Sequence, residues 1–410
     1  MRVPVALERR DRRVTTMHVL LLSFYFPPDL SAGSFRMEAL VTALQKRLGP
    51  DSRITVITTR PNRYGSFDAQ APAKEVRGGL TIHRVDLPAH QSGMRDQARA
   101  FATFAWQTRR LVARERPDVV VATTSRLMTG VLGAWAARNR RTPLYLDIRD
   151  IFVDTIGDVL PRRATWLLKP LFSALEKWAV RSATQVNLVS PGFLPYFQPR
   201  YPGRSFSVLS NGVDDAFLEN RNVQHAHPQT AAAPLHVLYA GNLGEGQGLH
   251  HILPALAQRL GDEVRFTVVG DGGRRVQLEE ALAVLPRHGV ILLPPVKRAE
   301  LIQLYNQADV LFVHLNDLPA FEKVLPSKLF EYAATGKPIW AGLAGFPAQF
   351  TQQEIENAAV FNPCDAAGAM AAFRTLRLHT CDRSAFVDKY RRTQIMNRMA
   401  DEIARIGSRS

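Results

Sequence analysis

Residues 326–331, which read Pro-Ser-Lys-Leu-Phe-Glu, combine the side chains of an anion-binding helix start. Ser327 can cap a short helix and Gly336 can end it, which places Glu331 on the first turns. Unsatisfied backbone amides and the helix dipole favour a phosphate at such a start, and Lys328 adds a positive charge beside it. A well-capped surface helix would show the same residues, so physics alone leaves both interpretations open.

A group of acids and one arginine forms a second candidate for chemistry. Asp147, Asp150 and Asp154 together offer carboxylates for a metal ion. Arg149 suits a phosphate instead, because its guanidinium stays protonated at neutral pH and cannot act as a base.

The elements that must position these residues alternate between apolar strands and helices, in two series. Strands that are apolar throughout have no water-facing side, which indicates parallel sheets covered by helices on both faces. The first series has predicted strands at residues 18–26, 53–59, 80–85, 118–122 and 143–147, and helices near 37–44, 94–115 and 128–139. The second has strands at 235–239, 265–269, 290–293, 310–314 and 338–341, and helices from 249, from 274, at 299–306 and at 328–334.

These two series predict how the chain divides. We expect a disordered leader over residues 1–16, a first domain over 17–219, a linker over 220–234, a second domain over 235–380, and a last helix within 381–410 that crosses back to the first domain. Doubly wound sheets bind ligands at the carboxyl ends of their strands, so the sites should face a cleft between the domains.

Composition limits the classes of protein that fit. Of the 410 residues, 46% are hydrophobic and 22% are charged, which excludes disorder over most of the chain. The net charge of +15 suits nucleic acid, an anionic membrane or a phosphorylated substrate. Cys364 and Cys381 are too few for a disulfide framework and fit a reducing compartment. The longest apolar run, residues 17–26, is too short to span a bilayer.

Two stretches, residues 95–116 and 161–181, are basic and amphipathic. In each, arginines and lysines surround an apolar side, which includes Phe101 and Phe104 in the first and Leu171 in the second. Such segments suit an anionic bilayer surface, but core-facing helices with solvated faces would look the same. We expect no nucleic-acid partner, because the chain has neither a recognition motif nor an aromatic platform.

A resemblance to a known family rests on several short motifs taken in their order. They are residues 24–28 (FYFPP), 33–36 (GSFR), 147–150 (DIRD), 211–214 (NGVD), 239–244 (YAGNLG), 269–272 (VGDG), 308–310 (ADV) and 326–332 (PSKLFEY). Together they resemble the family 4 retaining glycosyltransferases, above all the bacterial polysaccharide and O-antigen branch, over nearly the whole chain. The resemblance implies the GT-B architecture of two Rossmann-like α/β domains, with a nucleotide sugar bound mainly to the second and the acceptor mainly to the first.

The resemblance also implies roles for individual residues. Glu331 matches the glutamate that holds the ribose hydroxyls, and the helix start at residues 327–329 matches the one under the diphosphate. Gly33 and Ser34 match a loop whose small side chains let the backbone approach the leaving group. The full set of predicted donor-binding residues is Gly33, Ser34, Asn242, Gln247, Gly272, Val296, Lys323, Ser327, Lys328, Leu329 and Glu331.

The chain departs from the family pattern at the first of two paired glutamates. The family has seven residues between the two, whereas eight lie between Glu322 and Glu331. Either a loop adjustment lets Glu322 reach the sugar, or Lys323 takes the position with the opposite charge. We predict Glu322 as the catalytic residue.

Two further departures concern charge. Asn242 and Gln247 stand where many relatives have Arg and Lys, whose charges neutralise the departing diphosphate. In this chain Lys328, Lys323 or both would have to neutralise it. Arg149 and Asp150 replace a His-Asp pair, and we place both at the catalytic site, with Arg149 clamping a phosphate.

The resemblance therefore implies a retaining glycosyltransferase that needs no metal and no other cofactor. The expected donor is a UDP-sugar, and the expected acceptor is a saccharide, free or linked to polyprenyl diphosphate, in bacterial surface polysaccharide synthesis. The expected location is the cytoplasm, peripheral to the inner membrane, with an anionic membrane surface as partner. A nucleotide-sugar epimerase of the same architecture and a nucleotide-binding relative without catalysis remain alternatives.

Overall fold

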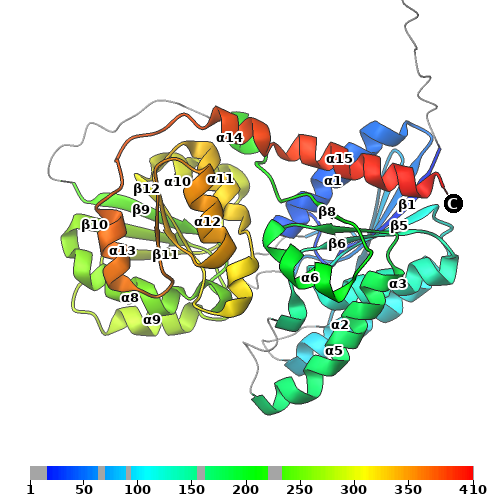
Figure 1. The fold of residues 1–410 in the computed structure, drawn as a ribbon, viewed down its shortest axis with the longest axis horizontal. Coiled ribbons are helices and arrows are strands. Elements are labelled where there is room, and N and C mark those ends of the chain that lie inside the picture. Colours follow the sequence, from blue (N-terminus) through cyan, green and yellow to red (C-terminus); the bar gives the residue numbers. More distant parts are fainter. Residues whose placement is uncertain (1–15, 63–69, 89–93, 155–161, 220–232, 410) are drawn as a thin grey trace, which may run out of the picture.

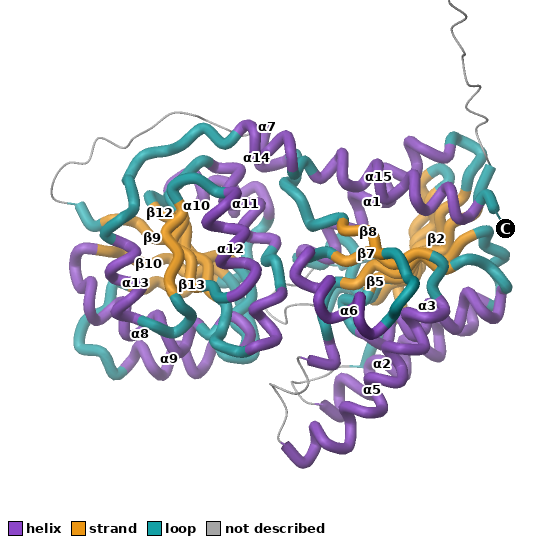
Figure 2. The backbone as a smooth tube through the Cα atoms, in the orientation of Figure 1, coloured by secondary structure: helices purple, strands orange, loops and turns teal. Residues whose placement is uncertain are grey.

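Two α/β domains make up the part of the chain that the structure describes (Figure 1). The computed structural model describes residues 16–62, 70–88, 94–154, 162–219 and 233–409. In each domain a sheet lies between layers of helices (Figure 2), which confirms the predicted fold class of two doubly wound sheets. The predicted leader and linker lie outside the described residues, except for residue 16 and residues 233–234.

The first sheet has eight strands in the order β3-β4-β2-β1-β5-β6-β7-β8, and all neighbours are parallel except β3 and β4. The central strands are buried at every residue, as apolar sequences covered on both faces require. The strands are β1 (His18–Leu22), β2 (Arg53–Thr59), β3 (Lys74–Arg77), β4 (Leu80–Val85), β5 (Val119–Thr123), β6 (Leu144–Ile148), β7 (Gln185–Leu188) and β8 (Phe206–Val208).

Two helix layers cover this sheet. On one face α1 packs against α15, which returns from the end of the chain, and Met37 and Met399 share that core. The other face carries the core that includes Phe104 and Leu132. The helices are α1 (Ala32–Leu48), α2 (Met94–Val112), α3 (Leu127–Arg140), α5 (Arg162–Ser182), η1 (Pro191–Phe193), α6 (Leu194–Arg200) and, from the chain end, α15 (Arg392–Gly407). The short helix α7 (Ala216–Glu219) packs instead against the second domain, where Phe217 joins the core.

The second sheet has six parallel strands in the order β11-β10-β9-β12-β13-β14. These are β9 (Leu235–Ala240), β10 (Val264–Val269), β11 (Val290–Leu293), β12 (Val310–His314), β13 (Ile339–Gly342) and β14 (Ala358–Phe361). Its helices are η2 (Glu245–Gln247), α8 (Leu249–Leu260), η3 (Gly261–Glu263), α9 (Arg275–Ala283), α10 (Arg298–Gln307), η4 (Pro319–Lys323), α11 (Ser327–Thr335), α12 (Gly345–Glu354), α13 (Ala366–Phe373) and α14 (Ser384–Lys389).

Strands β3, β7, β8 and β14 are absent from the sequence-based prediction. Each has three or four residues, and β3 reads Lys-Glu-Val-Arg, so no apolar run marks it. Charged residues on an edge strand discourage pairing with other chains, and β3 is an edge strand. Within the described residues, no helix is both long enough and apolar enough to cross a membrane.

A fully buried ion pair lies between α1 and β6. Arg36 donates from Nε and Nη2 to the two carboxylate oxygens of Asp147, at 3.1 and 3.0 Å. The same guanidinium also donates to the carbonyls of Leu209 and Ser210, at the start of the segment that leads to the second domain. Burial alone would raise the pKa of Asp147, but Arg36 outweighs it and lowers that pKa. The carboxylate of Asp147 therefore serves the fold, and the metal cluster considered for Asp147, Asp150 and Asp154 does not form around it.

Glu176 provides a prediction about stability and pH. This buried residue of α5 accepts hydrogen bonds from the hydroxyls of Tyr196 (3.2 Å) and Tyr201 (3.1 Å). Burial raises the pKa of Glu176 from 4.5 to about 7, although the two hydroxyls oppose the shift. As pH rises from 4.5 to 7, the glutamate of the unfolded chain ionises before that of the folded chain, so the folded state loses stability, on the order of 2 kcal/mol.

Glu176→Gln should abolish this loss, because a glutamine accepts the same hydrogen bonds without ionising. The measurement is urea unfolding of both proteins at pH 5 and pH 8. Equal pH dependence in wild type and variant would contradict the assignment.

Candidate donor-binding site

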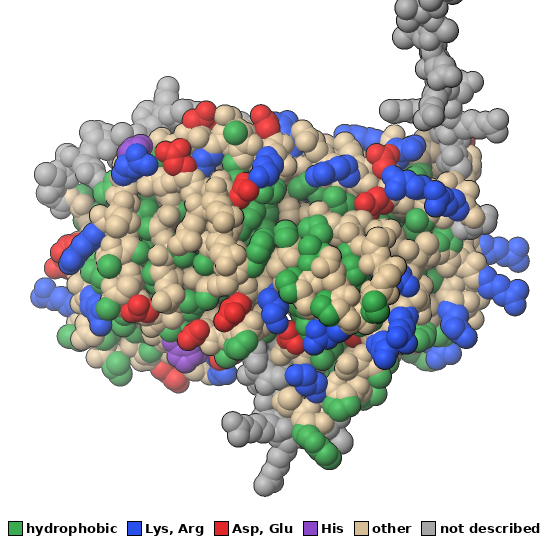
Figure 3. Space-filling view, viewed as in Figure 1, with side chains coloured by type: hydrophobic (Ala, Val, Ile, Leu, Met, Phe, Trp, Pro, Cys, Tyr) green, Lys and Arg blue, Asp and Glu red, His purple; other side chains and the backbone are tan. Residues whose placement is uncertain are grey.

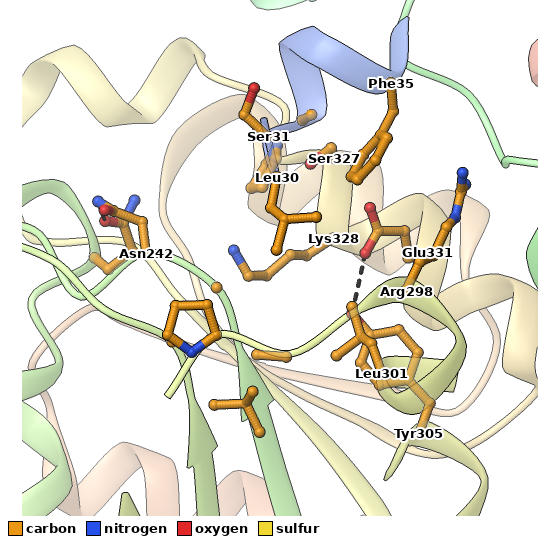
Figure 4. Close-up of a pocket in the computed structure, with 18 of the residues that line it drawn as sticks. Leu30, Ser31, Phe35, Asn242, Arg298, Leu301, Tyr305, Ser327, Lys328 and Glu331 are labelled. Carbon is orange, nitrogen blue, oxygen red and sulfur yellow. Dashed lines mark hydrogen bonds between the residues drawn. The ribbon is translucent and has the colours of Figure 1, made fainter. Parts of the chain in front are cut away.

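A cavity of about 370 Å³ lies between the domains, at the carboxyl ends of parallel strands (Figure 4). Half of the predicted site residues line it: Asp150, Asn242, Gln247, Val296, Ser327, Lys328 and Glu331. The other half do not: Gly33, Ser34, Arg149, Gly272, Glu322, Lys323 and Leu329. The position agrees with the rule that doubly wound sheets bind ligands beyond the carboxyl ends of their strands.

Helix α11 begins at the cavity without a side-chain cap. The prediction that Ser327 caps this helix is wrong: Pro326 occupies the N-cap position, and Ser327 is already the first helical residue. Proline has no side-chain acceptor, so its side chain cannot satisfy the first amides of α11. Gly336 ends the helix in the left-handed region (φ 76°), as predicted. An uncapped helix start beside a lysine suits an anionic ligand.

The side chain of Lys328 lies across Gly241 and extends toward Asn242 (Figure 4). A Cβ atom on Gly241 would collide with Lys328 Nζ, and the φ of 148° at Gly241 also disfavours a side chain there. Lys328 Nζ lies 5.2 Å from the ring centre of Tyr239. A glycine at the end of β9 thus leaves room for the lysine to cross the cavity floor.

Glu331 lies one turn further along α11. The hydroxyl of Tyr305 donates to its Oε2 at 3.0 Å, drawn as the dashed line in Figure 4. Burial raises the pKa of Glu331, and the nearby Lys328 opposes the shift. The Tyr305 hydroxyl therefore orients the carboxylate of Glu331, and Glu331 also lines the cavity.

Asn242 and Gln247 bond to each other in the loop after β9. Asn242 Nδ2 donates to Gln247 Oε1 at 2.8 Å, which makes a neutral pair on the cavity wall. Gly272 lies behind this loop: a Cβ atom there would come within 2.6 Å of the Leu243 carbonyl. Gly272 therefore allows two loops to touch, because any larger residue would separate them, and it does not line the cavity.

On the side of the first domain, Asp150 lines the cavity, whereas its neighbour Arg149 does not line it. Burial lowers the pKa of Arg149 to about 10, with the nearby Arg36 contributing. Arg149 Nη1 is buried and has no hydrogen-bond partner among the described residues. A Cβ atom on Gly33 would lie 3.6 Å from Arg149 Nε, so this glycine borders the arginine rather than the cavity.

Ser34 and Leu329 are placed by packing. Ser34 is buried in the first turn of α1, and its amide donates to the capping hydroxyl of Ser31 at 3.1 Å. Leu329 is fully buried in the second-domain core, which is the expected place for an apolar side chain on the inner face of α11. Neither side chain lines the cavity, so any role of Ser34 and Leu329 in donor binding would rest on their backbone, as predicted for the α1 loop and the α11 start.

Glu322 and Lys323, the two candidates for the position of the first family glutamate, both lie in η4, and neither side chain lines the cavity. Lys323 Nζ turns to the first domain and pairs with Asp154 at 2.6 Å. Glu322 is exposed, and its backbone packs against Gly345. In a 3₁₀-helix successive side chains point about 120° apart, and here Phe321 takes the position that faces the cavity.

Arg298 and Phe35 are among the cavity residues that sequence analysis missed. Arg298, the first residue of α10, pairs with Asp214, and its guanidinium lies 4.8 Å from the ring centre of Phe35. Phe35 reaches the same cavity from α1 (Figure 4). Asp214 and Phe35 belong to motifs that sequence analysis had already singled out. Their contacts with Arg298, however, depend on how distant segments of the chain pack together.

Comparisons with known proteins agree with this geometry. A model of the glycosyl transferase 4-like domain matches residues 33–212, and a model of glycosyl transferases group 1 matches residues 220–389. The protein named "Putative colanic acid biosynthesis glycosyl transferase WcaI" from Escherichia coli (strain K12) is 36% identical over 101 residues, which are 24% of each chain. The alignment thus spans about a quarter of the length of that curated relative.

Solved structures share the fold. HepE from Anabaena, solved in complex with UDP-glucose, has a TM-score of 0.65 at 17% identity and covers 94% of this chain and 98% of its own. WaaG, a glycosyltransferase involved in lipopolysaccharide biosynthesis, has a TM-score of 0.60 at 14% identity, with 93% and 95% covered. The two matched domain models and the two facing sheets together show that the chain belongs to family 4 of the glycosyltransferases, with the GT-B fold.

Proposed function

We propose that this protein is a retaining, metal-independent glycosyltransferase that uses a UDP-sugar. Its acceptor is a saccharide, free or linked to polyprenyl diphosphate, in bacterial surface polysaccharide synthesis. The observation that carries the proposal is the placement of Lys328 and Glu331 one turn apart on α11, both facing the interdomain cavity. The named role of WcaI in colanic acid biosynthesis and the UDP-glucose bound to HepE support the choice of pathway class and donor.

The chemistry assigned to each residue follows from its charge. Glu331 accepts hydrogen bonds from the ribose hydroxyls, while Tyr305 fixes its orientation. Lys328 and the uncapped amides of α11 stabilise the diphosphate as negative charge builds on it. The neutral pair of Asn242 and Gln247 adds no charge there, so Lys328 carries this task from the second domain.

In the proposed transfer, the acceptor hydroxyl attacks the anomeric carbon on the face that the diphosphate leaves. The bond between that carbon and the phosphate oxygen breaks, the acceptor oxygen forms a new one, and the acceptor proton passes to the departing phosphate. Asp150 lies at the cavity edge on the first domain, where the acceptor arrives. The protein contributes by positioning the donor and the acceptor and by stabilising the negative charge on the departing diphosphate.

The test is a panel of nucleotide sugars and acceptors, read out by free UDP and by the anomeric configuration of the product. We expect UDP release that requires an acceptor, survives EDTA, and retains configuration. An epimerase would convert the donor without an acceptor. Tight UDP binding without turnover over a broad panel would instead indicate a relative that has lost catalysis.

Lys328→Ala should weaken UDP binding about tenfold or more while leaving uridine binding nearly unchanged, because only UDP carries the diphosphate. Isothermal titration of both ligands measures the difference. Lys297→Ala is a suitable control, since Lys297 is exposed and does not line the cavity. Equal losses of affinity for UDP and for uridine would contradict the assignment of Lys328 to the diphosphate.

We also propose that the first domain rests on an anionic membrane through α2 and α5. Trp106 on α2 is 54% exposed and Leu171 on α5 is 55% exposed, and Arg110 stacks over the Trp106 ring at 3.5 Å. Figure 3 shows basic and hydrophobic side chains together over the lower end of the first domain. Exposed apolar side chains next to cations suit the headgroup region of a bilayer.

Sedimentation with phosphatidylglycerol vesicles tests this surface. The wild type should bind at low salt and dissociate as salt rises, and Trp106→Ser with Leu171→Ser should weaken binding several-fold. Val276→Ser, which changes an exposed residue of the second domain, should have no effect. Unchanged sedimentation of the double variant would exclude α2 and α5 as the membrane-binding surface.

A further inference from the structure

A second cavity, of about 360 Å³, lies in the first domain between α5 and α6. We call it the α5–α6 pocket. Trp166, Lys169 and Ser173 line it from α5, and Tyr196 and Arg200 from α6. Asp154 also lines it and accepts a hydrogen bond from Lys323 of the second domain at 2.6 Å. The donor-binding residues described above play no part in it.

Positive charge exceeds negative charge among the described residues that line this pocket. Lys169 and Arg200 are cationic, and the Arg200 guanidinium is held over the Tyr196 ring at 3.6 Å while it donates to the Tyr196 carbonyl at 2.9 Å. Among the described lining residues Asp154 is the only acid, and its carboxylate is bonded to Lys323. Two cations facing a small cavity suit a phosphate or diphosphate group.

The rest of the lining suits a sugar. Trp166 is 81% exposed, and such a flat apolar face can stack on a sugar ring while its indole N–H donates a hydrogen bond. Pro170 lies inside α5 and lines the pocket. Because proline has no amide hydrogen, the carbonyl of Trp166 lacks its usual helical donor and can accept from a sugar hydroxyl.

The position of the pocket connects it with the transfer site. Lys323, bonded to Asp154 of the pocket wall, lies 5.9 Å from the Tyr196 ring centre. Its neighbour in η4, Phe321, lines the donor cavity, as does Val324. The carbonyl of Lys323 also accepts from Ser190 in the first domain at 2.7 Å. The two cavities therefore lie on either side of η4, at the seam between the domains.

We propose that the α5–α6 pocket binds the acceptor through a saccharide that carries a phosphate or diphosphate. Lys169 and Arg200 bind the anionic group, and Trp166 stacks on the sugar beside it. This inference rests on the proposed function and makes it more specific, since it requires an anionic acceptor. It also accounts for a basic pocket on the same helix as the proposed membrane surface.

The first test is titration of inorganic pyrophosphate into protein saturated with UDP, so that the donor cavity is already filled. We expect one further site, weakened at least tenfold by Lys169→Ala and by Arg200→Ala. Lys177→Ala is the matched control, because Lys177 is exposed on the same helix but does not line the pocket. UDP affinity should be the same in all variants, which also shows that they are folded.

The second test uses farnesyl diphosphate with and without a linked glucose. The sugar should raise affinity in the wild type and in Trp106→Ala but not in Trp166→Ala. No additional pyrophosphate site, or one that Lys169→Ala and Arg200→Ala leave intact, would overturn the proposal. Binding to phosphatidylglycerol vesicles that depends on Lys169 and Arg200 without any soluble diphosphate binding would assign these cations to the membrane surface instead. If the proposed function itself fails, UDP will not bind or no UDP will be released in an acceptor-dependent reaction, whereas failure of this inference alone leaves both UDP binding and acceptor-dependent UDP release intact.

Discussion

Asp147→Ala should lower the free energy of unfolding by about 3–5 kcal/mol, because it leaves the buried guanidinium of Arg36 without its counter-ion. Both side chains are completely buried, and Asp147 also accepts from Asn187 Nδ2 at 2.7 Å. Since Arg36 holds the carbonyls of Leu209 and Ser210 as well, the loss should extend to the segment between the domains. Urea unfolding followed by far-UV circular dichroism measures the change.

The exposed pair of Arg47 and Asp401 provides the control. Its side chains are 42% and 51% exposed, so Asp401→Ala should cost less than about 1 kcal/mol. The double variant Arg36→Met with Asp147→Leu should recover much of the lost stability, because it removes both charges of the pair together. A small loss for Asp147→Ala, similar to that of Asp401→Ala, would show that the buried pair does not stabilise the domain.

Glu331→Ala should weaken UDP binding by roughly 1.5–3 kcal/mol, which is about 10- to 150-fold. Two ribose hydroxyls that donate to one carboxylate form charge-assisted hydrogen bonds, and alanine removes both. Uridine binding should fall by a similar factor, because uridine carries the same ribose. This pattern is the opposite of the one expected for Lys328→Ala, and calorimetric titration with both ligands separates the two residues.

Two variants test whether the effect is specific to the Glu331 carboxylate. Glu300→Ala changes an exposed glutamate of α10 that does not line the cavity, and it should leave UDP affinity unchanged. Tyr305→Phe removes the hydroxyl that orients Glu331 and should produce a smaller loss than Glu331→Ala. Unchanged UDP affinity in a folded Glu331→Ala protein would disprove the assignment of Glu331 to the ribose.

Prediction from sequence succeeded where the signal is local. Lys328 and Glu331 are three residues apart in a helix that Gly336 ends, so helical geometry alone places them on one side of α11. The strands β2, β4, β11 and β12 also have the predicted bounds. Their apolar and β-branched residues give the local signal, although only β12 is buried at every residue. The cap at Ser327 was wrong because serine at the first helical position and serine at the N-cap differ by one residue, within the ordinary uncertainty of a helix boundary.

Periodicity and short motifs are properties of neighbouring residues, so they were enough to predict the two α/β domains, the shared side of Lys328 and Glu331 on α11, and the family. Three placements became known from the folded chain alone: Lys323 pairs with Asp154, Glu322 faces solvent, and Asp147 pairs with Arg36. The partners of Lys323 and Asp147 lie more than 100 residues away in the sequence, and the direction of Glu322 depends on the geometry of the 3₁₀-helix η4. Local spacing carries no information about such partners, because packing between distant segments brings them together.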